Sequence, residues 1–358
     1  MHITASAPGK LVLLGEYAVL FGHPSLVMAV NRRARVEVGP SDGASWRVSA
    51  PGFCGDDADF DLDSIRGFAW RAPDSHAARQ LVLVERVLHS LVKAKLLDPD
   101  GLPPATITLN TDEFFLPVDA GRAKLGLGSS AALTVTITEA VRSWDRREQQ
   151  NAPLDLGALL ELHRSFQGGR GSGIDLAASL RGGVTEYRLV GERKRPDAHG
   201  GELPAELEMV HVWTGRSAST ADFLARLAQG MRSNGAAIEA ALGELGRVAT
   251  AGINHLRLGD TGGFLDDVDD YLVAMQELGH TTGIPVVSEE HLRLQELANA
   301  SGVRYKPSGA GGGDVGLGFT VDPKAAAVFA SRAKKAGFTP LDLHIDPQGV
   351  RVGCGRVE

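Results

Sequence analysis

The feature that most constrains the fold is a glycine and serine segment that runs directly into an apolar stretch. Residues 124–132 read KLGLGSSAA, and residues 131–144 are expected to form a helix. Glycine accepts the positive φ angles that let a backbone approach a ligand closely. The free N–H groups at a helix N-terminus favour phosphate, and a serine hydroxyl there can cap the helix or reach a metal or phosphate oxygen. The segment predicts a phosphate-binding loop, with a plain capped helix as the alternative.

Two common nucleotide motifs do not fit this loop. A Walker A loop places its lysine after the last glycine, whereas Lys124 precedes Gly126. A dinucleotide-binding fingerprint needs a third glycine where Ala131 stands. A Rossmann fold is therefore only weakly indicated.

Three further segments place glycine beside residues that can do chemistry. They read APGK at 7–10, GSGIDLAA at 171–178 and PSGAGGGD at 307–314. The glycine run near residue 310 suits a backbone that passes close to a ligand, although a flexible loop would look the same. Asp175 could be an ordinary helix cap. Lys10 follows a Pro8-Gly9 turn signal and could be a surface residue or a charge-stabilising catalytic group.

Composition narrows the class of protein. The chain has 358 residues with 43% hydrophobic content, a length compatible with about two domains. A net charge of -7 and a pI of about 5.9 do not favour nucleic-acid binding. Two cysteines are too few for a disulfide scaffold. No signal peptide and no apolar run of roughly 20 residues is present, so we expect a cytoplasmic protein without a membrane partner.

The pattern of elements mixes strands and helices in both halves and predicts an α+β class. Strands are expected at 3–7 and 11–14, and an amphipathic helix at 76–97. The Asp-rich and Gly-rich stretch 54–63 is expected to be an exposed loop. The polar stretch 191–205 is the best boundary, giving domains 1–195 and 196–358, although it could also be a long hairpin.

The motifs APGK, GLGSSA and SGAGGGD occur in the order of the three motifs of the GHMP kinase superfamily, which the chain resembles from about residue 5 to residue 320. Within it, GEYAVL at 15–20, GSGID at 171–175 and WTG at 213–215 are most similar to the phosphomevalonate kinase branch. The resemblance implies a ribosomal protein S5 domain 2-like N-terminal domain and a ferredoxin-like C-terminal domain. ATP and Mg²⁺ would bind between them.

The resemblance also implies roles for individual residues. Lys10 and Asp175 would be catalytic and flank the reacting oxygen, and the Ser130 hydroxyl would be linked to Mg²⁺. The expected ATP contacts are Lys124, Gly126, Leu127, Gly128, Ser129, Ser130 and Ala131. The expected substrate contacts are Tyr17, Arg170, Ser172, Ser219, Ser308, Gly309, Ala310 and Gly311.

The chain departs from the superfamily at one position. Relatives usually carry a metal-binding glutamate about a dozen residues before the catalytic aspartate. Here the nearest acid before Asp175 is Glu161, which leaves the protein ligands of the metal open. Mg²⁺ could be held mainly by ATP phosphates, Ser130 and water, since this ion keeps its waters.

The implied activity is ATP-dependent phosphorylation of (R)-5-phosphomevalonate to 5-diphosphomevalonate, in the mevalonate route to isoprenoids. A phosphomonoester is already mostly deprotonated at neutral pH. Asp175 would then orient Lys10 or the substrate, and Lys10 would offset developing negative charge. The expected partner is a small-molecule substrate, with a homodimer possible. Mevalonate kinase or another small-molecule GHMP kinase is the alternative, and a non-catalytic sensor of ATP and metabolite is the alternative of another class.

Overall fold

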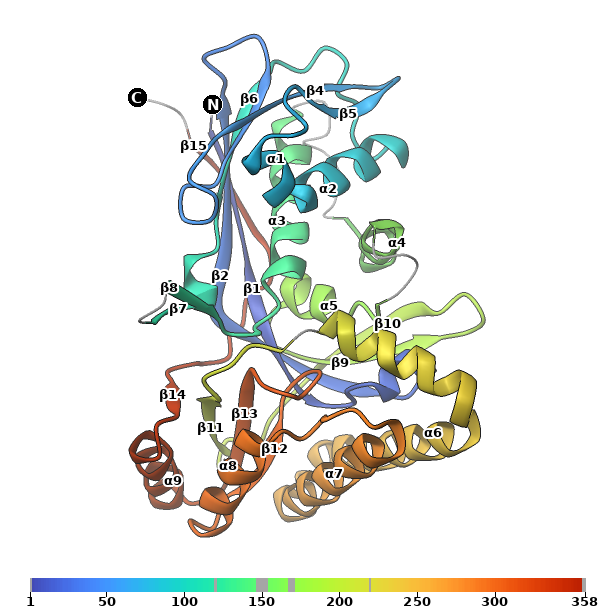
Figure 1. Ribbon diagram of the computed structural model, residues 1–358, viewed down its shortest axis with the longest axis vertical. Coiled ribbons are helices and arrows are strands. Elements are labelled where there is room, and N and C mark those ends of the chain that lie inside the picture. The colour runs from blue at the N-terminus through green and yellow to red at the C-terminus, as the bar shows by residue number, and fades with distance from the viewer. Residues whose placement is uncertain (1, 119–120, 146–153, 167–170, 219, 356–358) are drawn as a thin grey trace.

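The computed structural model describes residues 2–118, 121–145, 154–166, 171–218 and 220–355. The elements form an upper and a lower half, each built on its own sheet (Figure 1). In the upper half, helices cover one face of a long twisted sheet. In the lower half, helices pack around a smaller antiparallel sheet. The mixed architecture confirms the predicted α+β class.

The first sheet contains nine strands in the order β10-β9-β2-β6-β3-β4-β5, with β1 between β2 and β15. Its strands are β1 (His2–Leu14), β2 (Ser25–Pro40), β3 (Trp46–Ser49), β4 (Ala58–Asp63), β5 (Gly67–Trp70), β6 (Ala105–Asn110), β9 (Val184–Val190), β10 (Arg195–Gly201) and β15 (Arg351–Gly355). All pairs are antiparallel except β3 with β6. A small hairpin, β7 (Phe115–Val118) with β8 (Gly121–Lys124), precedes the glycine loop.

The turn predicted at Pro8-Gly9 is wrong, because β1 continues through both residues. Its pairing with β2 shifts register between them, which marks a bulge. A Cβ at Gly9 would lie 2.6 Å from the Leu127 carbonyl oxygen and 2.7 Å from the Phe114 ring. Gly9 therefore lets the glycine loop pack directly against the strand.

The helices of the first half are α1 (His76–Gln80), α2 (Val82–Lys93), α3 (Ser129–Trp144), α4 (Leu156–Phe166) and α5 (Ile174–Arg181), with short 3₁₀ turns at Ala18–Phe21 and Asp112–Phe114. The expected helix at 76–97 forms but breaks at Leu81. The expected loop at 54–63 is wrong in its second half. There β4 alternates buried and half-buried residues, which period-2 spacing on a sheet face explains.

The polar stretch after β9 forms the hairpin β9–β10 of the first sheet. The sheets change only between Gly201 and Glu208, and β15 returns the end of the chain to the first sheet. The division into 1–195 and 196–358 therefore stays a proposal. We propose a domain boundary at 202–207, with the C-terminal strand β15 assigned to the first domain.

The second sheet has the strand order β12-β13-β11-β14. Its strands are β11 (Glu208–Trp213), β12 (Arg304–Pro307), β13 (Val315–Thr320) and β14 (Thr339–Leu341), and its helices are α6 (Thr220–Arg257), α7 (Thr261–Thr282), α8 (Glu289–Asn299) and α9 (Pro323–Lys335). Along the chain, this half has a strand, helices, two strands, a helix and a strand, and the last strand lies beside the first. This is the predicted ferredoxin-like arrangement. Helix α6 has a kink at Asn234, whose backbone angles are not helical. Among the described residues, no helix is long and apolar enough to span a bilayer.

Candidate active site

A cavity of ≈ 540 Å³ opens where both halves meet, between β1, the glycine loop, the N-terminus of α5 and the loop after β12. Most of the predicted site residues line it: Lys10, Tyr17, Lys124, Gly126, Gly128, Ser129, Ser130, Ala131, Ser172, Asp175, Gly309 and Ala310. Segments far apart in the sequence therefore meet at one place. Such a concave site with a few convergent polar groups is where a small ligand binds.

The glycine loop leads into α3 with Gly128 as its N-cap, at φ 79°. Neither Ser129 nor Ser130 caps the helix, since the N-cap makes no side-chain hydrogen bond. The serine hydroxyls are therefore not used as caps, and the first turn of α3 lies at the cavity wall with its serines. Helix N–H groups at such a terminus suit a phosphate. Leu127 does not line the cavity, because its side chain lies in the core and its carbonyl oxygen accepts a hydrogen bond from Lys10 N at 2.8 Å.

Lys10 lies inside β1 and only 7% of it is exposed, so the surface alternative is wrong. A Cβ at Gly128 would lie 3.2 Å from Lys10 Cγ, and one at Gly309 would lie 3.7 Å from Lys10 Nζ. The lysine thus runs between the glycine loop of the first half and the glycine run of the second. A buried cation between two glycine-rich loops can neutralise charge on a phosphoryl group.

Asp175 lies in the first turn of α5, whose N-cap is Gly173. The ordinary-cap alternative is therefore wrong for Asp175. Its Oδ2 lies 3.6 Å from the position that a Cβ at Gly128 would take, on the same side as Lys10. His163 on α4 also lines the cavity. Burial lowers the pKa of His163, and the nearby Asp175 carboxylate opposes that shift.

The loop after β12 is held against β1 by hydrogen bonds. Ser308 Oγ accepts from Val12 N at 2.9 Å and donates to Val12 O at 3.0 Å. The Tyr17 hydroxyl donates to the Ala310 carbonyl. A Cβ at Gly311 would lie 1.9 Å from the Val286 carbonyl oxygen. Ser308 and Gly311 are therefore packed into the support of the loop and do not line the cavity, unlike Gly309 and Ala310.

Sequence reasoning assigned no site role to Asp314, which lines the cavity beside Gly126. Its Oδ1 accepts from Ala218 N at 3.1 Å, and a Cβ at Gly126 would lie 2.2 Å from its Cγ. Burial raises the pKa of Asp314, while the Ala218 N–H, Lys10 and Lys124 oppose the shift. The position of this aspartate directly after the glycine run was the available signal.

A buried ion pair beneath the cavity was also missed. Lys306 Nζ donates to Glu16 Oε1 at 2.6 Å, and the two side chains are 0% and 2% exposed. Glu16 Oε1 also accepts from Gly309 N at 3.3 Å, so the pair supports the glycine run from below. Burial lowers the pKa of Lys306, and Glu16 opposes the shift. Nothing local in the sequence links residues 290 positions apart.

Two other predicted site residues, Arg170 and Ser219, lie outside the described residues. Glu161, the nearest acid before Asp175 in the sequence, is exposed on α4 and does not line the cavity.

Comparison with known proteins shows what this chain is similar to. Residues 83–183 match the model described as GHMP kinases N terminal domain. The similarity to enzymes of that kind extends over nearly the whole chain. The chain is 29% identical to the phosphomevalonate kinase of Streptomyces sp. (strain CL190) over 97% of this chain and 98% of that protein. It is 27% identical to the mevalonate kinase of Thermococcus gammatolerans over 98% of each.

The fold agrees with that similarity. The structure of Streptococcus pneumoniae phosphomevalonate kinase in complex with phosphomevalonate and AMPPNP matches with a TM-score of 0.74 at 18% identity, over 96% of this chain and 99% of that one. The similarity indicates a phosphotransferase, and GHMP kinases use ATP. The relatives divide between two substrates of the mevalonate pathway.

A magnesium ion that accompanies ATP fits the donors present. Mg²⁺ keeps several waters and takes one or two protein oxygens together with phosphates. The described residues contain no group of three or more acidic, histidine or cysteine side chains that could hold a metal by themselves. Ser130 and the carboxylates of Asp175 and Asp314 line the same cavity. This set suits an ion carried by nucleotide phosphates.

Proposed function

We propose that this protein is a GHMP kinase that transfers the γ-phosphoryl group of ATP to the phosphate of phosphomevalonate, with Mg²⁺. The observation that carries the proposal is the convergence of Lys10 and Asp175 with two glycine-rich loops at one cavity. The similarity to the Streptomyces phosphomevalonate kinase over the full length of both chains supports the choice of acceptor.

The proposed binding mode of ATP follows from the loop geometry. N–H groups at the start of α3 and the glycine loop hold the β- and γ-phosphates, with Lys124 at the rim. Mg²⁺ would neutralise phosphate charge at Ser130. The backbone of Gly309 and Ala310 closes the pocket from the second half. Phosphoryl transfer needs positioning and charge neutralisation more than covalent chemistry, which is what these groups provide.

Lys10 and Asp175 have different proposed tasks. Lys10 lies between both loops and offsets the charge that develops as the phosphoryl group moves. An acceptor phosphate is already deprotonated at neutral pH, so Asp175 orients the acceptor and Lys10 without removing a proton. An alcohol acceptor, as in mevalonate, would need Asp175 as a general base worth about 10²–10⁴ in rate.

The test is to follow ADP release with Mg·ATP and either phosphomevalonate or mevalonate. We expect turnover with phosphomevalonate alone. Lys10→Met is expected to lower kcat by at least about a hundredfold, in the range of charge-stabilising groups. Asp175→Asn is expected to lower it by only about tenfold, below the general-base range. Lys93→Met, an exposed lysine on α2, is the matched control and should be active.

Each other outcome has a definite meaning. Turnover with mevalonate alone, together with a loss of about a thousandfold in Asp175→Asn, would contradict the acceptor and assign mevalonate kinase activity. Nucleotide binding without turnover on either acceptor would favour the sensor alternative.

A further inference from the structure

The chain between β14 and β15 leaves the second sheet and runs back along the first (Figure 1). We call residues 344–350 the return segment. It docks first on β2, where Asn31 N donates to His344 O at 3.0 Å and His344 N donates to Asn31 Oδ1 at 2.9 Å. Asp346 N then donates to Ala29 O at 3.0 Å. The segment is therefore fixed to the strand beside β1.

The return segment also supports the C-terminal end of α5. Gly183 N donates to Asp346 O at 2.7 Å, and Val350 N donates to Leu180 O at 3.2 Å. A Cβ at Gly349 would lie 2.0 Å from Leu180 O, so backbone meets backbone without a side chain between them. The close approach requires glycine here. We call these contacts between α5 and the return segment the seat of the helix.

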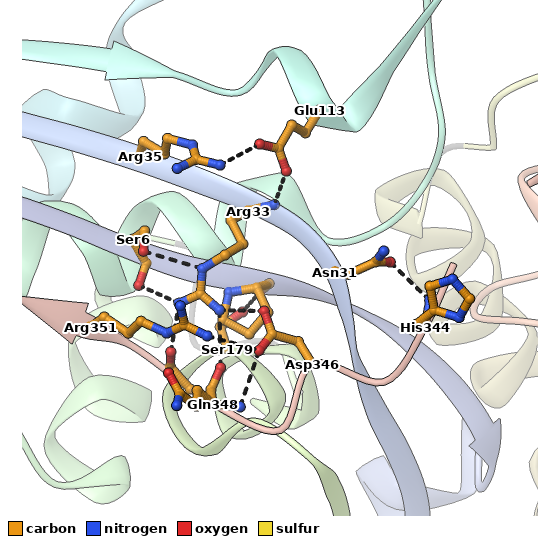
Figure 2. Close-up of polar contacts among 12 residues, drawn as sticks. Ser6, Asn31, Arg33, Arg35, Glu113, Ser179, His344, Asp346, Gln348 and Arg351 are labelled. Carbon is orange, nitrogen blue, oxygen red and sulfur yellow. Dashed lines mark hydrogen bonds and ion pairs between the residues drawn. The ribbon is translucent and has the colours of Figure 1, made fainter. Parts of the chain in front are cut away.

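The Arg33 side chain of β2 also holds the return segment in place (Figure 2). Its guanidinium donates to the Asp346 carboxylate, to Gln348 O at 3.0 Å and to Gly349 O at 2.7 Å. It also donates to both oxygens of Ser6, at 2.9 and 3.1 Å. The Arg33 and Asp346 side chains are only 8% and 7% exposed. Because every N–H of the planar Arg33 guanidinium has an acceptor, this side chain fixes the geometry better than the point charge of a lysine would.

The same helix carries Asp175 at its other end. Ser179 Oγ on α5 donates to Pro8 O at 2.8 Å, two residues before Lys10 on β1. An eight-residue helix is about 12 Å long. A shift of its C-terminal end therefore reaches Asp175 with little attenuation. Neither Arg33 nor Asp346 lines the cavity.

We propose that Arg33 and Asp346 are positioning residues, which seat α5 on the return segment and so fix Asp175 relative to Lys10. The proposal rests on the proposed roles of Lys10 and Asp175 in phosphoryl transfer. The C-terminal part of the chain would then control the geometry of a reaction at the N-terminal end of α5.

The test compares Asp346→Ala and Arg33→Lys with Arg35→Gln. Arg35 lies on the same strand two residues further on and pairs with Glu113 in an exposed ion pair away from the return segment. We expect kcat to fall by up to about tenfold in the first two variants, no more than in Asp175→Asn, since misplacement by about 1 Å can lower rates strongly. The KM for Mg·ATP should change by no more than about twofold, because the glycine loop is untouched. Arg35→Gln should behave like the wild type.

A double-variant cycle separates positioning from plain loss of stability. If the seat acts through Asp175, adding Asp346→Ala to Asp175→Asn should lower kcat little further. Full multiplication of the two losses in folded protein would overturn the proposal, as would an unchanged kcat in both single variants.

Hydrogen exchange tests the proposal if Asp346→Ala does not fold or if the wild type is inactive. Amides of 174–183 should exchange faster in Arg33→Lys, whereas amides of α7 should not change. Arg33→Lys keeps the positive charge and can be used even if Asp346→Ala does not fold. Unchanged exchange at 174–183 would overturn the proposal. If the wild type phosphorylates neither acceptor, the proposed function fails, and this exchange experiment still decides whether the seat exists.

Discussion

The two glycine-rich loops that meet at the cavity are held in place in different ways. The loop 126–130 is fixed by backbone: Lys10 N donates to Leu127 O at 2.8 Å, Leu125 N donates to Phe114 O at 3.0 Å, and the chain continues into α3. The run 309–313 has one backbone hydrogen bond, from Gly312 N to Val286 O at 2.9 Å, and is otherwise fixed by buried side chains around it. These side chains are Glu16, His291, Lys306 and Ser308.

The difference shows where each loop is vulnerable. A loop held by backbone hydrogen bonds tolerates changes in the side chains of its neighbours. It does not tolerate a side chain added at one of its own closely packed glycines. A loop held by side chains fails when one distant polar group is left buried without its partner. Four variants test this contrast, from the largest expected effect to the smallest.

Lys306→Met should have the largest effect, because it leaves the Glu16 carboxylate buried without its cation. We expect the free energy of unfolding to fall by about 3–5 kcal/mol, measured by urea denaturation. Adding Glu16→Gln should restore part of the loss, since the buried charge is then gone. Arg247→Met, which breaks the exposed pair with Glu244, should change stability little. A small effect of Lys306→Met would mean that the second loop does not depend on this pair.

His291→Gln should change how stability depends on pH. His291 Nε2 donates to Gly313 O at 2.8 Å, and Nδ1 therefore accepts from the Tyr305 hydroxyl at 2.7 Å, which requires the neutral ring. Burial lowers the pKa of His291 from 6.5 to about 4. Its contribution is present above pH 6.5 and is lost as the pH falls to about 4, because the unfolded ring protonates first.

The measurement for His291 is the difference in unfolding free energy between wild type and variant across that range. The wild type should lose about 3 kcal/mol more than the variant between pH 6.5 and pH 4. The similarly buried His211 remains in both proteins and cancels in the difference. Parallel curves would show that His291 does not fix the second loop in its neutral form.

Gly126→Ala tests the backbone-held loop. The new methyl group would lie 2.2 Å from Asp314 Cγ, at a φ of 77° that disfavours side chains. Asp314 would have to leave Ala218 N, so we expect kcat/KM for ATP to fall at least about a hundredfold, or about 2.7 kcal/mol. Gly101→Ala has a similar φ of 80° with nothing within 4 Å and should be active. Equal activity of both variants would show that close approach at the loop does not matter.

Ser308→Ala should have the smallest effect. It removes both hydrogen bonds to Val12 and leaves a buried N–H unpaired, which costs about 1–2 kcal/mol of stability. Ser233→Ala removes an exposed local hydroxyl contact and serves as the control in the same thermal unfolding experiment. A loss as large as that expected for Lys306→Met would mean that the run depends on the serine more than on the ion pair.

The same contrast explains what could be predicted from the sequence. The α+β class, the helix after the glycine loop and the place of Lys10 and Asp175 at one cavity follow from local patterns and ordered motifs. The ion pair of Glu16 with Lys306 and the seat of α5 join residues hundreds of positions apart, and single-sequence periodicity carries no signal for such contacts. The turn expected at Pro8-Gly9 failed because a bulge uses the same residues as a turn.

The pairing of β1 with β15 has a consequence for how the protein is made. His2 lies opposite Gly355, so one edge of the first strand stays open until the last strand has left the ribosome. At about 5–20 residues per second, translation leaves that edge exposed for roughly 20–70 s. An unpaired strand edge is a template for association with other chains. The first half of the molecule therefore depends on a strand that is made after the whole second sheet, and chaperone protection during synthesis matters more for it than for the self-contained second sheet.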